Sequence, residues 1–259
     1  MKVVILAGGY GTRLSEETDM RPKPMLEIGD RPILWHIMKG YAQAGFTDFV
    51  VLLGYKGYMI KEYFANYFLH NCDVTIDTAK GSMEVLNSSS ENWKVTLVDT
   101  GLDTMTGGRV LRAQKYIGRE RFLRTYGDGV CSVDFKQLLK FHETHGKKMT
   151  MTAIQPEGRF GAINMDATSG QVASFLEKPK GDGTWVNGGF FVCEPSVFDY
   201  LKEGDRTILE RTPMETLARE GQLVAHRHTG FWQCMDTLRD KTLLNDMWKK
   251  GEAKWKVWS

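Results

Sequence analysis

The sequence predicts an α/β fold in which a doubly wound, mostly parallel, Rossmann-like sheet carries an appended β-rich region. Up to about residue 155, short apolar runs alternate with segments of helical spacing, as expected when helices connect parallel strands. Beyond that point, strand-like segments follow one another with fewer helices between them. Because 259 residues suit one such unit, we expect a single domain over 1–259, with parts at about 1–155 and 156–259.

The first part alternates regularly between the two patterns. Continuous apolar runs predict buried strands at 2–7 and 49–53, and further strands are expected at 95–98, 121–126 and 149–154. Apolar residues three or four positions apart predict helices at 32–44, 58–69, 110–117 and 135–144. The segment 81–92 shows neither pattern and contains three consecutive serines, so we expect a surface loop there.

The second part is richer in strands. Residues 158–177 predict a β meander with a turn at 168–170, and further strands are expected at 186–192 and 223–228. Short and long helices are expected at 215–219 and 238–249. The basic, aromatic run 248–258 is expected to pack on the body of the protein or on a neighbouring subunit.

Composition and charge exclude several classes of protein. The net charge is +2, and 42% of the residues are hydrophobic, so bulk charge does not indicate a partner among nucleic acids or anionic membranes. No apolar run approaches the ~18 residues of a membrane span. The four cysteines form no C-x-x-C pair, which argues against a zinc site or a disulfide framework: Cys72, Cys131, Cys193 and Cys234. We therefore expect a cytoplasmic protein.

A glycine-rich segment directly after the first strand is the strongest local motif. It consists of Leu6, Ala7, Gly8, Gly9, Tyr10, Gly11, Thr12, Arg13 and Leu14, and is followed by Pro22-Lys23-Pro24. Glycines let backbone N–H groups approach phosphate, and an arginine and a lysine add positive charge. Leu14 stands where a dinucleotide fingerprint needs glycine, and no lysine follows as in a P-loop. A glycine-rich turn without a ligand is the structural alternative.

These two segments resemble those of the sugar-1-phosphate nucleotidylyltransferases. The resemblance implies that residues 6–13 wrap a nucleoside triphosphate, that Arg13 neutralises the departing pyrophosphate, and that Lys23 holds phosphate at the reacting centre. Glu16 replaces the proline usual in that family. This departure and the segment 104–109 resemble the branch of the family that joins CTP and glucose 1-phosphate into CDP-glucose, as in lipopolysaccharide O-antigen synthesis. A uridylyl- or thymidylyltransferase and a non-catalytic nucleotide sensor are the alternatives.

Two aspartates are candidates for a magnesium site. Asp128 follows the strand 121–126, and Asp236 follows another apolar segment at 231–235. Mg²⁺ prefers carboxylate, phosphate and water oxygens, and nucleotidyl transfer needs a divalent cation. The family resemblance assigns both aspartates to this ion. Asp128 as a turn residue and Asp236 as the N-cap of the last helix remain the structural alternatives.

The resemblance also suggests where the base and the sugar bind. Thr104, Gly108, Arg109 and Gly127 are expected at the nucleotide, with Arg109 donating to O2 and N3 of cytosine. Arg109 exposed to solvent at a glycine-rich helix start is the alternative. The candidates at the sugar phosphate are Glu177, Lys178, Asn187 and Gly189. A surface ion pair and a closely packed strand are the alternatives there. We also expect a homo-oligomer.

Overall fold

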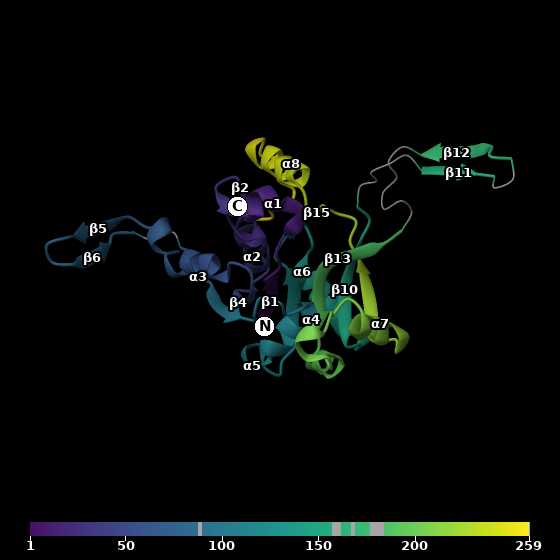
Figure 1. The fold of residues 1–259 in the computed structure, drawn as a ribbon, viewed down its shortest axis with the longest axis horizontal. Helices are drawn as coiled ribbons and strands as arrows, with labels where there is room; N and C mark the ends of the chain where they lie inside the picture. Colours follow the sequence, from purple (N-terminus) through teal and green to yellow (C-terminus); the bar gives the residue numbers. More distant parts are fainter. Residues whose placement is uncertain (88–89, 157–161, 167–168, 177–183, 259) are drawn as a thin grey trace.

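The computed structural model describes residues 1–87, 90–156, 162–166, 169–176 and 184–258. Its centre is a seven-stranded mixed sheet (Figure 1) of order β14-β10-β13-β8-β1-β4-β7. These strands are β1 (Lys2–Ala7), β4 (Asp48–Leu53), β7 (Lys94–Asp99), β8 (Phe122–Tyr126), β10 (Met149–Ile154), β13 (Val186–Cys193) and β14 (Leu223–Arg227). The predicted α/β class with a mostly parallel sheet is confirmed, because β1 is parallel to both β4 and β8, β4 to β7, and β10 to β14.

Helices cover both faces of the sheet. The α-helices of the described residues are α1 (Ser15–Thr18), α2 (Ile33–Gln43), α3 (Gly57–Ala65), α4 (Thr106–Arg112), α5 (Gln114–Ile117), α6 (Phe135–His145), α7 (Thr212–Arg219) and α8 (Leu238–Lys249). Alternate residues of β1 enter different apolar clusters: Val3 and Ile5 pack with α2 and α6, whereas Val4 and Leu6 pack with α4 and α7. Both faces of the central strands are therefore buried, which explains their continuous apolar sequences.

Strand β13 joins the two parts of the chain. It runs antiparallel between β8 and β10, with Phe191 opposite Arg124 on one side and opposite Met151 on the other. A strand from the second part therefore lies between two strands of the first part. The β-rich part is built into the central sheet at this point, and it also extends the edge through β14.

Two hairpins extend from opposite sides of the body (Figure 1). One pairs β5 (Val74–Asp77) with β6 (Ser82–Val85), and the other pairs β11 (Ala162–Met165) with β12 (Val172–Leu176). The prediction of a loop over 81–92 is wrong for β6. Its apolar side chains are exposed, as are Ile76 and Phe175, so no buried face imposes the alternation from which strands are predicted.

The C-terminal run packs on the body through its tryptophans. Trp255 and Trp258 are buried, and their rings lie against His36 of α2. Burial lowers the pKa of His36 to about 4, so this ring is neutral at pH 7. The expectation for the basic, aromatic run is thereby confirmed for the protein's own body. In the part of the chain that the structure describes, no helix combines the length and apolarity needed to cross a membrane.

Candidate active site

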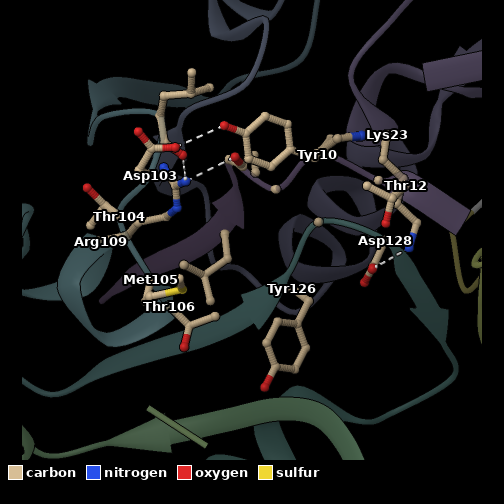
Figure 2. Close-up of a pocket in the computed structure, with 18 of the residues that line it drawn as sticks. Tyr10, Thr12, Lys23, Asp103, Thr104, Met105, Thr106, Arg109, Tyr126 and Asp128 are labelled. Atoms are coloured by element: carbon tan, nitrogen blue, oxygen red, sulfur yellow. Dashed lines mark hydrogen bonds and ion pairs between the residues drawn. The ribbon is translucent and has the colours of Figure 1, made fainter. Parts of the chain in front are cut away.

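A cavity of about 460 Å³ opens at the carboxyl ends of β1 and β8 (Figure 2). In doubly wound folds this edge of the sheet is where ligands bind. Most predicted nucleotide and metal residues line it: Leu6, Ala7, Gly8, Gly9, Tyr10, Gly11, Thr12, Lys23, Thr104, Arg109, Gly127, Asp128 and Asp236. The wall also contains Leu102 and Asp103, which no motif indicated, and further residues of the predicted segments: Pro24, Met105, Thr106 and Tyr126.

Two other predicted nucleotide residues are Arg13 and Gly108. Arg13 belongs to a short 3-10 helix, η1 (Thr12–Leu14), of which the structure describes the backbone but not the Arg13 side chain. Gly108 lies in α4 against the main chain of Asp205, where a Cβ atom would approach the Asp205 carbonyl oxygen to 2.6 Å. The described geometry therefore explains Gly108 by close packing, and its contact with a nucleotide stays a prediction.

Arg109 is buried and binds the glycine-rich loop through a hydrogen bond to Gly8 O. It is only 5% exposed, so the alternative of a solvent-exposed arginine is wrong. Its terminal nitrogens donate to Gly8 O, Leu53 O, Thr100 Oγ1, Gly101 O and Leu102 O at 2.6–3.1 Å. A Cβ atom on Gly8 would lie 2.4 Å from the guanidinium, which explains why this position is glycine. Both terminal nitrogens already bind protein oxygens, so direct contact of Arg109 with a base stays a prediction.

Tyr10 also connects the glycine-rich loop to the 99–109 region. Its hydroxyl donates to Asp103 Oδ1 at 3.0 Å, and its ring lies 5.3 Å from that of Tyr55. Figure 2 shows Tyr10 and Asp103 above Arg109, on the side of the cavity away from Asp128. The loop is thus attached to the 99–109 region through Gly8 and Tyr10, and the backbone of Gly9 and Gly11 lines the cavity.

Lys23, Asp128 and Asp236 converge on one point of the cavity. Lys23 begins a 3-10 helix, η2 (Lys23–Met25), and its ammonium lies 2.7 Å from Asp128 Oδ2 and 2.5 Å from Asp236 Oδ1. The two aspartates meet because β9 (Gly129–Cys131) pairs antiparallel with β15 (Trp232–Cys234), and Met235 N donates to Asp128 O. Burial acts to lower the pKa of Lys23, but the two carboxylates outweigh it and raise the pKa above its ordinary value.

The cap of α8 separates the two interpretations of Asp236. Thr237 is the N-cap, since its side chain accepts from Asp240 N while Asp240 Oδ2 accepts from Thr237 N. The alternative that Asp236 caps this helix is therefore wrong. Asp128 does follow β8 at a turn, as its own alternative proposed, but its carboxylate is directed at Lys23 rather than at the turn.

The converging carboxylates have the chemistry that a magnesium ion requires. Two oxygen-bearing groups face a single cation position at the cavity, and phosphate and water oxygens would complete the coordination. Within the described ranges, no three His, Cys, Asp or Glu side chains gather into a site that would hold a metal unaided. The residues thus fit a metal that is shared with a phosphate ligand.

The predicted sugar residues are only partly described. Glu177 and Lys178 lie outside the described residues. Gly189 has φ +84°, and a Cβ atom there would lie 2.7 Å from the Tyr126 ring, so a closely packed strand accounts for this glycine. The Asn187 side chain accepts from Gly189 N at 2.9 Å and donates to Tyr126 Oη at 3.5 Å. Both residues contact Tyr126 and are not among the residues that line the cavity. Their contact with a sugar stays a prediction.

Sequence reasoning missed a charged cluster beneath Tyr126. The Glu210 carboxylate accepts from Arg124 Nη2 at 2.7 Å, and from Tyr126 Oη and Thr106 Oγ1 at 2.5 Å each. Burial acts to raise the pKa of Glu210, but Arg124 and the two hydroxyls outweigh it and lower the pKa below its ordinary value. The available signal was an arginine in the middle of an apolar strand, because buried charge is rarely without a partner.

Comparison with known proteins identifies the family. The model of the family described as "Nucleotidyl transferase" matches residues 2–237. The chain is 59% identical over 259 residues to a glucose-1-phosphate cytidylyltransferase of Salmonella typhi, covering 100% of both. It is 46% identical over 258 residues to a probable glucose-1-phosphate cytidylyltransferase of Bacillus subtilis, again covering 100% of both.

Solved structures support the same architecture. The structure of HddC from Yersinia pseudotuberculosis superposes with a TM-score of 0.68 at 23% identity, covering 95% of this chain and 99% of that one. A UDP-glucose pyrophosphorylase complexed with UDP-glucose gives a TM-score of 0.69 at 19% identity, covering 96% and 98%. At these identities the likeness concerns the fold alone. On the family match and the full-length relatives, the chain belongs to the nucleotidyl transferase family.

Proposed function

We propose that this chain transfers CMP from CTP to α-D-glucose 1-phosphate and releases pyrophosphate, in a magnesium-dependent reaction that yields CDP-glucose. The observation that carries the proposal is the convergence of the glycine-rich loop, Lys23 and two aspartates on one cavity at the sheet's carboxyl edge. Full-length identity of 59% to a glucose-1-phosphate cytidylyltransferase supports the choice of substrates.

The glycine-rich loop and the basic residues divide the work on the triphosphate. Backbone N–H groups of the loop around Gly9 and Gly11 bind phosphate oxygens, since no side chain there keeps the phosphate away. Lys23 binds phosphate at the reacting centre, and Arg13 neutralises charge on the departing pyrophosphate. Asp128 and Asp236 would hold the metal, which supplies charge stabilisation to the phosphate oxygens when bound.

The transfer is direct, with the sugar phosphate oxygen attacking the α-phosphorus and pyrophosphate leaving. Cys234, beside Asp236, does not offer a competing nucleophile, because burial and the neighbouring carboxylates raise the pKa of its thiol to about 12. Glu177, Lys178, Asn187 and Gly189 bind the sugar phosphate in this proposal. A sequential kinetic mechanism is expected, and exchange of labelled pyrophosphate into CTP without sugar phosphate would contradict it.

The proposal includes a cellular setting. The product would supply deoxysugar synthesis for lipopolysaccharide O-antigen, and the enzyme would work in the cytoplasm as a homo-oligomer without a nucleic-acid or membrane partner. Sedimentation of the purified chain tests the oligomer, and fractionation of cells tests the compartment.

Pyrophosphate release from four nucleoside triphosphates and several sugar 1-phosphates tests the activity. We expect CTP with glucose 1-phosphate to give the highest kcat/KM. Preference for UTP or dTTP would assign a sister activity instead. CTP binding without turnover, at saturating Mg²⁺ and sugar phosphate, would instead indicate a nucleotide sensor.

A further inference from the structure

An ion pair lies under the floor of the cavity, where the proposed reaction gives it no task. Arg124, in the middle of β8, is fully buried, and it donates to Glu210 in the segment before α7. Arg124 is removed from water entirely and Glu210 largely, since the Glu210 side chain is 29% exposed, and this removal is costly. Apolar side chains of similar volume commonly fill such a position at least as well. Burial alone therefore does not explain why this pair is present.

The Glu210 carboxylate connects two walls of the cavity. Oε1 accepts from Arg124 and from the Tyr126 hydroxyl, while Oε2 accepts from the Thr106 hydroxyl. Thr106 begins α4, two residues after the predicted base contact Thr104, and Tyr126 ends β8, two residues before Asp128. Thr106 and Tyr126 both line the cavity, whereas Glu210 is not part of its wall.

Tyr126 extends the connection to β13. Its ring lies against the Cα of Gly189, and its hydroxyl is 3.5 Å from Asn187 Nδ2. The Arg124 guanidinium stacks on the Tyr126 ring at 4.7 Å, so the ring is fixed on one face by a cation as well as at its hydroxyl. One carboxylate thus restrains segments that are far apart in sequence and that meet only around the cavity.

We propose that Glu210 is a positioning residue that sets the base-side wall at Thr106 and the sugar-side wall at Tyr126 relative to each other. The inference rests on the proposed function, which assigns residues 104–109 to the base and Asn187 to the sugar. Glu210 touches neither substrate. It acts through two hydroxyls that donate to its carboxylate, Thr106 from the base-side wall and Tyr126 from the sugar-side wall.

The proposal is tested by steady-state kinetics on variants that remove one of the two hydroxyls bound to Glu210 at a time. Thr106→Val removes the charge-assisted hydrogen bond to Glu210 and the one that Thr106 Oγ1 accepts from Leu209 N. It should raise KM for CTP about tenfold and change KM for glucose 1-phosphate less than about twofold. Tyr126→Phe should raise KM for glucose 1-phosphate about tenfold and change KM for CTP less than about twofold. Glu210→Gln should raise both KM values. Thr106→Ser keeps the hydroxyl and should restore the wild-type KM for CTP.

Asp205→Asn is the matched control, because Asp205 pairs with Arg112 at the exposed surface of the same region. It should leave both KM values unchanged. If Thr106→Val and Tyr126→Phe change neither KM, or change both by the same factor, Glu210 serves the fold and the proposal fails. Both variants keep the Arg124–Glu210 pair, so the test does not depend on Glu210→Gln folding.

Asn187→Ala separates this inference from the proposed function. If it leaves KM for glucose 1-phosphate unchanged while Tyr126→Phe raises it, the sugar assignment of Asn187 is wrong but the positioning role of Glu210 stands. If Asn187→Ala raises that KM and Tyr126→Phe does not, the sugar assignment stands and the positioning role fails.

Discussion

Two charged clusters lie at the same cavity and differ in the balance of positive and negative charge. At the first, one ammonium, Lys23, faces two carboxylates, and Asp128 and Asp236 keep 32% and 19% of their side-chain surface exposed. At the second, the fully buried Arg124 faces one carboxylate, Glu210, which two hydroxyls also bind. The first cluster has an excess negative charge at the cavity, and we expect a metal ion to replace Lys23 there. The second is neutral and holds its groups in place.

Removing a carboxylate from the first cluster should have the largest effect on activity. Asp128→Asn and Asp236→Asn should each lower kcat about 10³-fold, about 4 kcal/mol, because each would misplace the metal charge at the phosphate. Folding should change little, which circular dichroism and thermal unfolding check. Excess Mg²⁺ should restore part of the activity of each variant.

The double variant sharpens this result. Asp128→Asn/Asp236→Asn should be scarcely slower than either single variant, since both losses act through one ion and are not additive. Fully additive losses, or near-normal activity of Asp236→Asn at limiting Mg²⁺, would contradict a shared metal site.

Removing the cation of the second cluster should have its main effect on the free energy of unfolding. Arg124→Met leaves the Glu210 carboxylate without its opposite charge and should cost about 3–5 kcal/mol. The double variant Arg124→Met/Glu210→Gln should recover part of this loss, because the uncompensated charge is gone. Urea denaturation measures both. A double variant less stable than Arg124→Met would mean that the hydrogen bonds which the Glu210 carboxylate accepts from Thr106 and Tyr126 outweigh the cost of its unpaired charge.

Lys23 should show that the first cluster can exchange its cation. Lys23→Met should lower kcat about 10²-fold, since one charge contact made in the transition state is worth roughly 3 kcal/mol. Yet Mn²⁺, without nucleotide, should bind this variant about tenfold more tightly, because no internal ammonium then competes for the carboxylates. Titration calorimetry measures the affinity. Lys39→Met is the control, since Lys39 pairs with Glu91 away from the cavity; unchanged Mn²⁺ affinity in Lys23→Met would refute the competition.

Arg109 is a third case, a buried cation held by main-chain carbonyls and one hydroxyl. Arg109→Lys offers fewer donors and should raise KM for CTP about fivefold, since roughly one hydrogen bond's worth of support is lost. If Arg109 also contacts the base, the ratio of kcat/KM for CTP over UTP should fall. An unchanged ratio with a raised KM would assign Arg109 to support of the loop alone.

The sequence predicted elements more reliably than their arrangement. Strand 2–7 and helix 238–249 agree with the structure residue for residue, because continuous apolar runs and regular helical spacing are local signals. The strand at 186–192 was also expected, but nothing in its periodicity indicates that it lies between β8 and β10. The β5–β6 hairpin was missed because its side chains are exposed and show no buried face.

The sequence likewise predicted individual site residues better than the contacts between them. A dense motif predicted the glycine-rich loop, and the family resemblance predicted Lys23 and the two aspartates. The structure then brings Lys23, Asp128 and Asp236 within hydrogen-bonding distance. Glu210 could not be predicted, because a single glutamate before a short helix has no distinguishing neighbours, and its role depends entirely on tertiary contacts.

The position of β13 has a consequence for biosynthesis. When a ribosome has made the first 155 residues, β8 and β10 exist, but the strand that separates them in the sheet does not. We expect the nascent chain to keep the facing edges of β8 and β10 unpaired until residues 186–193 emerge, and then to close the sheet in one late step. A gene split near residue 155 would therefore yield two incomplete fragments, neither of which folds unless the other is present.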